Sequence, residues 1–216
     1  MPAPNTPSLE LDTGVVEGET IRGHRVDVFR GIPFARAIGA DRWRAPRPVD
    51  PWSSARSCTT FGPAPPQVVD DYRALFGASA AHSQSEDCLH LNLWKPAGAR
   101  SRLPIMVWLH GGGFAYGLAH HPMYDGRELA KRDVIVVTVP YRLNFFGMFA
   151  HPGLTAEAGF SGNYALLDVI EALRWVRRNA AAFGGDANNV TLFGESAGAR
   201  AISVLAAVGA ARGLFH

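Results

Sequence analysis

The residues best suited to chemistry lie near the end of the chain, in the run Val190-Thr-Leu-Phe-Gly-Glu-Ser-Ala-Gly198. An apolar strand is expected to lead into Gly194-Glu-Ser-Ala-Gly198, and an alanine-rich helical segment follows. The pattern G-x-S-x-G in this context predicts a tight turn that lifts Ser196 clear of a sheet, above a helix N-terminus. A serine hydroxyl is a good nucleophile only when a histidine accepts its proton and a carboxylate orients that histidine. Ser196 is therefore the candidate nucleophile.

A glycine-rich segment forms the second candidate feature. His110-Gly-Gly-Gly-Phe114 directly follows the apolar run at 104–109. Glycine lets the backbone approach a ligand closely, and convergent N–H groups stabilise negative charge on an oxygen. The segment also lies where open α/β sheets bind ligands, at the C-terminal end of a strand. Alone it fits a flexible or phosphate-binding loop equally well, but beside a serine elbow it predicts an oxyanion hole.

The expected partners of Ser196 do not follow it. Where this elbow carries a catalytic triad, the acid and the histidine come after the serine in the chain. Only 20 residues follow Ser196, and they contain no Asp or Glu and one histidine, His216. None of the earlier histidines has an acidic neighbour at triad spacing, and His110 is expected to shape the glycine segment. The chain lacks an evident general base.

Apolar patterns predict the elements that would position these residues. The continuous apolar runs at 104–109 and 134–139 indicate central strands buried on both faces. A short helix is expected within 125–132, and residues 164–183 form an amphipathic helix that ends at Gly184-Gly185. Half-buried antiparallel strands are expected earlier, at 13–18 and 25–30, and a further strand is expected at 89–94. Alternating strands and helices after residue 104 indicate an α/β fold with a parallel sheet and right-handed crossovers.

Composition limits the classes of function. The chain has 216 residues, enough for one domain with a sizeable core. Its net charge of +2 argues against nucleic-acid and membrane partners. No signal peptide or membrane-spanning run is evident, so a cytoplasmic protein is expected. The two cysteines suit neither a zinc site nor a redox pair. No metal is expected.

Further motifs occur in order along the chain: Phe29-Arg-Gly-Ile-Pro-Phe-Ala35, Glu86-Asp-Cys-Leu-His-Leu-Asn92, Tyr141-Arg-Leu143, Gly162-Asn-Tyr-Ala-Leu-Leu-Asp168, Phe183-Gly-Gly-Asp186 and Asn188-Asn-Val-Thr191. With the glycine segment and the elbow, they make the chain resemble the type-B carboxylesterase family, which includes cholinesterases and bacterial para-nitrobenzyl esterases. The resemblance runs from about residue 12 to the last residue. It implies an α/β-hydrolase fold and hydrolysis of small-molecule carboxylic esters through an acyl-enzyme, without a cofactor.

The resemblance assigns roles to single residues. By position, Ser196 is the nucleophile, and Gly112, Gly113 and Ala197 donate the oxyanion-hole N–H groups. Glu195 corresponds to a buried acid beside the nucleophile that helps to order the site. The alternative for Glu195 is an exposed residue of the elbow.

Two further pairs correspond to structural features of the family. Cys58 and Cys88 match the pair that closes an N-terminal disulfide loop. A cytoplasmic protein would keep these thiols reduced, so both states remain open. Arg42 and Glu86 match an ion pair that ties this loop down.

The chain also departs from the family. Ala78 stands where cholinesterases carry a tryptophan that binds quaternary ammonium by cation–π attraction, so a choline ester is not the expected substrate. Asn144 replaces a usual glycine. The segment Tyr141 to Phe149 is therefore where the resemblance predicts structure least well.

The family domain is more than twice as long as this chain. The resemblance therefore identifies 1–216 as the N-terminal portion of a single α/β-hydrolase domain, truncated after the nucleophile elbow and its helix. The strand that carries Ser196 would then lie at an unpaired sheet edge. The chain is expected to be marginal, aggregation-prone or dependent on a partner, with negligible esterase turnover. The oligomeric state is not predicted.

Three readings of function remain. The first is a serine carboxylic ester hydrolase whose triad acid and histidine are absent from this chain. The second is a catalytically inactive fragment or a cholinesterase-like non-catalytic binding domain, although such domains typically lose the serine. The third is an enzyme of the hormone-sensitive-lipase type, which lacks the motifs at 29–35 and 86–92.

Overall fold

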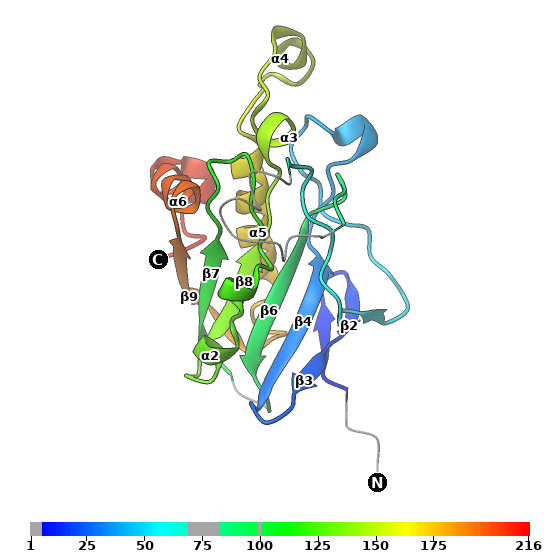
Figure 1. The fold of residues 1–216 in the computed structure, drawn as a ribbon, viewed down its shortest axis with the longest axis vertical. Coiled ribbons are helices and arrows are strands. Elements are labelled where there is room, and N and C mark those ends of the chain that lie inside the picture. The colour runs from blue at the N-terminus through cyan, green and yellow to red at the C-terminus, as the bar shows by residue number, and fades with distance from the viewer. Residues whose placement is uncertain (1–5, 69–82, 99–100) are drawn as a thin grey trace.

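The computed structural model describes residues 6–68, 83–98 and 101–216, so Ala78 lies outside the described residues. A six-stranded sheet in the order β3-β4-β6-β8-β7-β9 runs through the middle of the molecule (Figure 1). Its strands are β3 (Glu19–Ile21), β4 (Val26–Pro33), β6 (His90–Pro96), β8 (Ile135–Val139), β7 (Leu103–Leu109) and β9 (Gly185–Gly194). A smaller sheet contains β1 (Ser8–Leu11), β2 (Gly14–Glu17) and β5 (Arg56–Ser57).

The larger sheet is mixed. Strand β7 pairs in parallel with both β8 and β9, as the sequence predicts for this part of the chain. The other neighbours, β3 with β4, β4 with β6 and β6 with β8, pair antiparallel. The parallel pairing expected after residue 104 and the antiparallel pairing expected for the strand at 25–30 are both confirmed. Only residues 22–25 separate β3 from β4, and so short a turn permits antiparallel pairing alone.

Helices cover both faces of this sheet. They are α2 (Arg127–Ala130), α5 (Tyr164–Asn179) and α6 (Ala197–Ala207). Successive side chains of a strand point to opposite faces. Leu93 of β6 accordingly packs into the main core with α5 and α6, whereas Trp94 joins a smaller cluster with Ala130 of α2. The sheet thus separates α2 from the α5 and α6 layer.

Strand β7 differs from its predicted burial. All residues of β8 are buried, as expected for a central strand. In β7 one face is buried, but Met106 and Trp108 on the other face are only half-buried. The prediction of burial on both faces is wrong for β7. Helix α2 contacts β6 and β8, so it covers the sheet beside β7 rather than over it.

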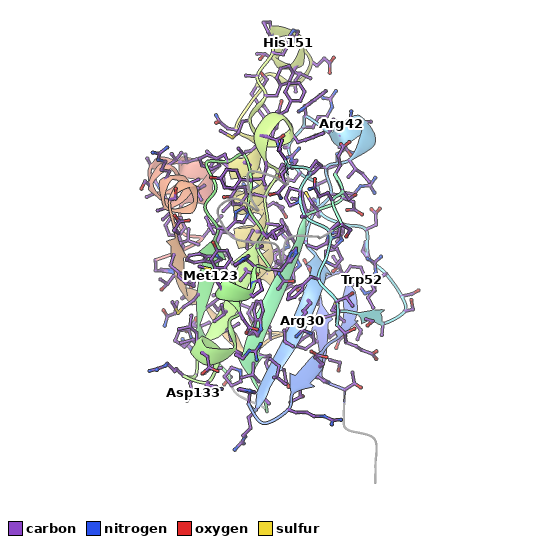
Figure 2. All side chains as sticks on the ribbon, in the orientation of Figure 1. Arg30, Arg42, Trp52, Met123, Asp133 and His151 are labelled. Carbon is purple, nitrogen blue, oxygen red and sulfur yellow. The ribbon has the colours of Figure 1, made fainter. Side chains whose placement is uncertain are left out.

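Two short helices, α3 (Asn144–Met148) and α4 (Pro152–Ala158), were not predicted. Helix α3 packs against α5, whereas α4 projects beyond it (Figure 1), and His151 lies at the projecting end (Figure 2). The His151 ring accepts a hydrogen bond from Gly153 N–H and so caps α4. Helix α5 begins where expected and ends four residues before the predicted Phe183. Three 3₁₀ turns complete the described elements, at Gly39–Asp41, Pro122–Tyr124 and Gly209–Ala211.

Candidate active site

The turn between β9 and α6 has the sharp geometry that the sequence predicts. β9 ends at Gly194 and α6 begins at Ala197, with Ser196 between them at φ 52° and ψ −114°. This conformation is rare for a residue with a side chain and stores strain. A Cβ atom at Gly194 or at Gly198 would strike the carbonyl oxygen of Leu109. Glycine at both positions lets the turn pack against the end of β7.

Ser196 is exposed at this turn. Its side chain makes no capping hydrogen bond at the start of α6, so the hydroxyl is not used to hold the helix. Within the described part of the chain, no histidine ring is hydrogen-bonded to Ser196. The structure therefore presents the candidate nucleophile without a base.

The glycine loop, residues 110–117, follows β7 and lies beside the elbow. Gly112 and Gly113 have φ values of 103° and 62°, in the region that favours glycine. A Cβ atom at Gly112 would collide with the carbonyl oxygen of Tyr116, whereas a Cβ atom at Gly113 would meet open space. The loop therefore packs tightly at Gly112 and is open at Gly113.

The carbonyl oxygens of the glycine loop are held away from the site. The N–H of Gly112 and the carbonyl oxygen of Gly111 belong to one peptide group. That oxygen lies 2.7 Å from Nδ1 of His110. The next peptide, which carries the N–H of Gly113, has its oxygen on Gly112. That oxygen accepts hydrogen bonds from Ala115 N–H at 2.9 Å and Tyr116 N–H at 3.1 Å. Because a trans peptide directs its C=O and N–H to opposite sides, these bonds fix the direction of both N–H groups.

The third candidate donor, the N–H of Ala197, is fixed in the same way. The carbonyl oxygen of Ser196 accepts a hydrogen bond from Arg200 N–H at 3.0 Å. Among the described residues, none of the N–H groups of Gly112, Gly113 and Ala197 donates to a protein acceptor. Three backbone donors with anchored carbonyls thus lie on the two segments that frame Ser196, which is the arrangement that can stabilise a developing oxyanion.

His110 is a buried, neutral part of the loop. Its ring stacks on Tyr141 with centroids 4.4 Å apart, and the Tyr141 hydroxyl donates to the His110 carbonyl. Burial lowers the pKa of His110 to about 4. Since a carbonyl can only accept, Nδ1 must be the protonated nitrogen that faces Gly111. This role fits the expectation that His110 shapes the loop.

Glu195 is exposed, so the expectation of a buried acid is wrong for this chain. Its carboxylate lies against Gly111, where a Cβ atom would strike Oε2. The charge of Glu195 adds to the effect of burial in raising the pKa of the Tyr124 hydroxyl. Strand β9 is the last strand of the sheet in the described part of the chain, and Glu195, which follows it, remains accessible to solvent.

Cys58 and Cys88 are both buried, and both are free thiols in the structure. The disulfide that the family resemblance suggested is therefore not formed here. Burial raises the pKa of Cys58 to about 11 and raises the pKa of Cys88 still further. Both side chains therefore remain protonated at neutral pH and serve as packing groups of the main core.

Ion pairs hold the segments around the site. The predicted pair is present, with Arg42 Nε 2.6 Å from a carboxylate oxygen of Glu86. A second pair, between Arg142 and Asp168, was not predicted from the sequence, and its side chains are 3% and 0% exposed. Arg142 also donates to the carbonyl oxygen of Arg42 at 3.0 Å and so links the two pairs. Arg142 lies in the motif Tyr141-Arg-Leu143, and Asp168 ends the motif that begins at Gly162. A charged residue in each of these largely apolar motifs could have indicated the pair.

The described residues contain no group of three or more His, Cys, Asp or Glu side chains arranged to hold a metal ion. They also contain no helix with the length and apolar character needed to cross a membrane.

Ser196 follows β9, and the glycine loop follows the neighbouring parallel strand β7, on a mixed sheet covered by helices on both faces. This arrangement defines an α/β-hydrolase fold. A model of the carboxylesterase family matches residues 5–216, and the chain belongs to this family.

Individual relatives agree with this assignment. The chain is 46% identical over 197 residues to the fumonisin B1 esterase of Sphingopyxis macrogoltabida, covering 89% of this chain and 35% of that protein. It is 45% identical over 205 residues to the para-nitrobenzyl esterase of Bacillus subtilis, covering 94% and 41%. The solved structure of a thermophilic PNB esterase matches with a TM-score of 0.88 at 43% identity, covering 98% and 43%. The chain thus spans less than half the length of each.

Proposed function

We propose that this chain carries the nucleophile and the oxyanion hole of a serine carboxylic ester hydrolase that acts on small-molecule esters. In this proposal the Ser196 oxygen attacks the ester carbonyl carbon, and the alcohol leaves to give an acyl-serine that water then hydrolyses. Negative charge develops on the carbonyl oxygen in both steps. The N–H groups of Gly112, Gly113 and Ala197 receive that charge.

One observation carries the proposal: three backbone N–H groups flank an exposed serine, and each has its peptide oxygen bonded elsewhere. Donors that are already directed need no reorganisation as charge develops, which makes them effective in catalysis. Removal of one such donor from a known oxyanion hole costs about 10²–10³-fold in turnover.

The general base is assigned to residues outside 1–216. His110 cannot serve, because it is buried and its Nδ1–H faces the carbonyl oxygen of Gly111. The chain alone is therefore expected to show negligible turnover, with at most the roughly 10³–10⁴-fold acceleration over water that remains when triad members are removed.

Fragment complementation tests this assignment. The chain is co-expressed with the part of the Bacillus subtilis para-nitrobenzyl esterase that its match does not cover, and para-nitrobenzyl ester hydrolysis is measured. We expect hydrolysis to appear in the assembly and to disappear in the Ser196→Ala variant. The chain alone, assayed in parallel, should hydrolyse the ester at a rate close to that of buffer.

Two outcomes would contradict the proposal. An assembly that forms but hydrolyses no ester would favour a non-catalytic binding domain, the alternative suggested by the absence of a histidine bonded to Ser196 in the described residues. Serine-dependent turnover at ordinary enzymatic rates by the chain alone would show that its general base lies within 1–216.

A further inference from the structure

The far end of the glycine loop is held by the side chain of Gln67. The N–H of Gly117 donates to Oε1 of Gln67 at 2.8 Å, and Nε2 of Gln67 donates to the carbonyl oxygen of Gly117 at 3.0 Å. The side-chain amide of Gln67 therefore bonds both the N–H and the C=O of Gly117, as the backbone of a neighbouring β-strand would. A backbone residue bonded on both sides cannot rotate without breaking both bonds.

Gln67 is itself held in place. Its Nε2 also donates to the carbonyl oxygen of Pro65 at 3.1 Å, and its backbone N–H donates to Oε1 of Gln84 at 2.8 Å. These partners determine which end of the amide is oxygen, because a flipped amide would set Nε2 against the Gly117 N–H. Gln67 is thus a fixed support for the loop.

Asn144 holds the middle of the same loop. Its backbone N–H donates to the carbonyl oxygen of Phe114 at 2.6 Å. Its Nδ2 lies 2.7 Å from the carbonyl oxygen of Pro66 and 3.4 Å from that of Ala115. The φ of Asn144 is 45°, in the left-handed region that asparagine and glycine tolerate best. A glycine at this position would keep the backbone conformation but could not make the side-chain bonds.

These bonds act on the turn that directs the Gly113 N–H. The carbonyl oxygen of Gly112 accepts hydrogen bonds from the N–H groups of Ala115 and Tyr116. Gly112 and Gly113 are conformationally free residues, so the direction of their N–H groups depends on what holds the rest of the loop. Asn144 holds residues 114 and 115, and Gln67 holds residue 117.

We propose that Gln67 and Asn144 form an amide clamp, a pair of positioning residues that keep the N–H groups of Gly112 and Gly113 directed at the oxyanion. This proposal rests on the proposed function, since it assigns the clamp to an oxyanion hole. Neither side chain touches substrate in this role. A misplacement of about 1 Å at a site of this kind can reduce catalysis roughly 10²-fold, which makes a dedicated support useful.

Two variants of the full chain test the clamp. Asn144→Gly removes the side-chain amide and suits a φ of 45°, and Gln67→Leu removes both bonds to Gly117. If Gln67→Leu does not fold, Gln67→Glu replaces it, because a glutamate keeps the acceptor but cannot donate to the Gly117 carbonyl. Asn189→Ala is the matched control, since Asn189 is an exposed amide on β9.

The first measurement is hydrogen exchange at the N–H groups of Ala115, Tyr116 and Gly117, which needs no catalysis. We expect exchange to become about tenfold faster in both clamp variants and to stay unchanged in Asn189→Ala. Unchanged exchange in both clamp variants would overturn the proposal.

The second measurement is binding of butylboronic acid, followed by ¹¹B NMR, in the assembly with the complementing esterase fragment, which supplies the base that Ser196 lacks in the chain alone. Boron accepts the Ser196 oxygen, the hydroxyl proton passes to solvent, and the tetrahedral adduct carries one negative charge that the donors receive. We expect about tenfold weaker binding in the clamp variants, with an unchanged thermal midpoint for Asn144→Gly. Equal binding in wild type and variants would overturn the positioning role.

No Ser196-dependent adduct in wild type would instead overturn the proposed function, and hydrogen exchange would then decide whether the clamp orders the loop.

Discussion

His110 shows how a single buried ring can serve the loop that follows it. The ring lies fully buried against Tyr141, and its Nδ1–H faces the carbonyl oxygen of Gly111. Protonation would place a positive charge in this apolar contact. It would leave the hydrogen bond to Gly111 in place, so the cost comes from burial of charge rather than from loss of that bond.

This burial predicts a pH dependence of stability. The pKa of His110 is about 4 in the folded chain, against a reference value of 6.5. Between these values the unfolded chain binds a proton that the folded chain does not. The free energy of unfolding is therefore highest, as far as His110 is concerned, above about pH 6.5. It falls by on the order of 3 kcal/mol as the pH drops towards 4. Urea unfolding at pH 7.5 and 4.5 measures the fall.

The contribution of His110 is separated from that of the carboxylates by NMR titration of its ring. The ring signals should show a neutral imidazole at pH 5. A ring that titrates near 6.5 would contradict the burial argument.

At the scale of elements, a buried ion pair joins two motifs that are distant in the sequence. Arg142 follows Tyr141 at the end of the loop after β8, and Asp168 lies in the first turns of α5. Their side chains are bonded through Nε at 2.8 Å and Nη2 at 2.7 Å, and Asp168 also accepts from the backbone N–H of Arg142. The pair thus fixes α5 relative to the segment that carries the clamp residue Asn144.

Removal of either partner leaves an uncompensated buried charge. We expect Arg142→Met to lower the free energy of unfolding by about 3–5 kcal/mol. Arg36→Ala is the control, because the Arg36–Asp50 pair is 46% and 87% exposed and should contribute less than about 1 kcal/mol. Chemical denaturation of both variants makes the comparison. A loss for Arg142→Met no larger than the loss for the control would show that the pair does not hold these elements.

The elements of the sheet could be predicted because their patterns are local. Continuous apolar runs gave β7 and β8, and the alternation of polar and apolar residues gave β4 and β6. The helices α3 and α4 depend on supports distant in sequence, such as Trp43, whose ring packs on Phe145 at 5.3 Å. Periodicity within a short segment holds no information about such contacts.

The candidate site divides in the same way. Ser196 and the glycines belong to short contiguous motifs, so sequence alone identified them. Gln67 and Asn144 act from segments 50 and 29 residues from their partners Gly117 and Ala115, and only the folded chain brings them together. The burial of Glu195 was inferred from a family whose members are more than twice as long as this chain, and in the described structure Glu195 is exposed.

For the whole molecule, an open sheet edge bears on behaviour in solution. Strand β9 is at one edge of the larger sheet among the described residues, as expected from the sequence. His216 bonds to the backbone of Val190, so one position on this edge is covered. Free edge strands are templates for pairing with other chains.

We therefore expect the purified chain to self-associate through β9. Thr191→Lys places a charge on this edge at an exposed position and should shift the chain towards monomer. Ala156→Lys adds the same charge at an exposed position on α4 and should leave the association unchanged. Sedimentation velocity over a concentration series distinguishes them. A chain that is monomeric at high concentration and unfolds cooperatively would contradict the expectation.

The backbone strain at Ser196 bears on how the sequence is maintained. A serine held at φ 52° and ψ −114° is disfavoured by about 1–3 kcal/mol, whereas glycine would adopt these angles without that cost. Natural selection for stability alone would therefore replace the serine. A lineage keeps a destabilising residue when the residue's chemistry outweighs the loss of stability. Replacement of Ser196 by glycine would therefore relieve the strain and remove the reactive hydroxyl in the same mutation.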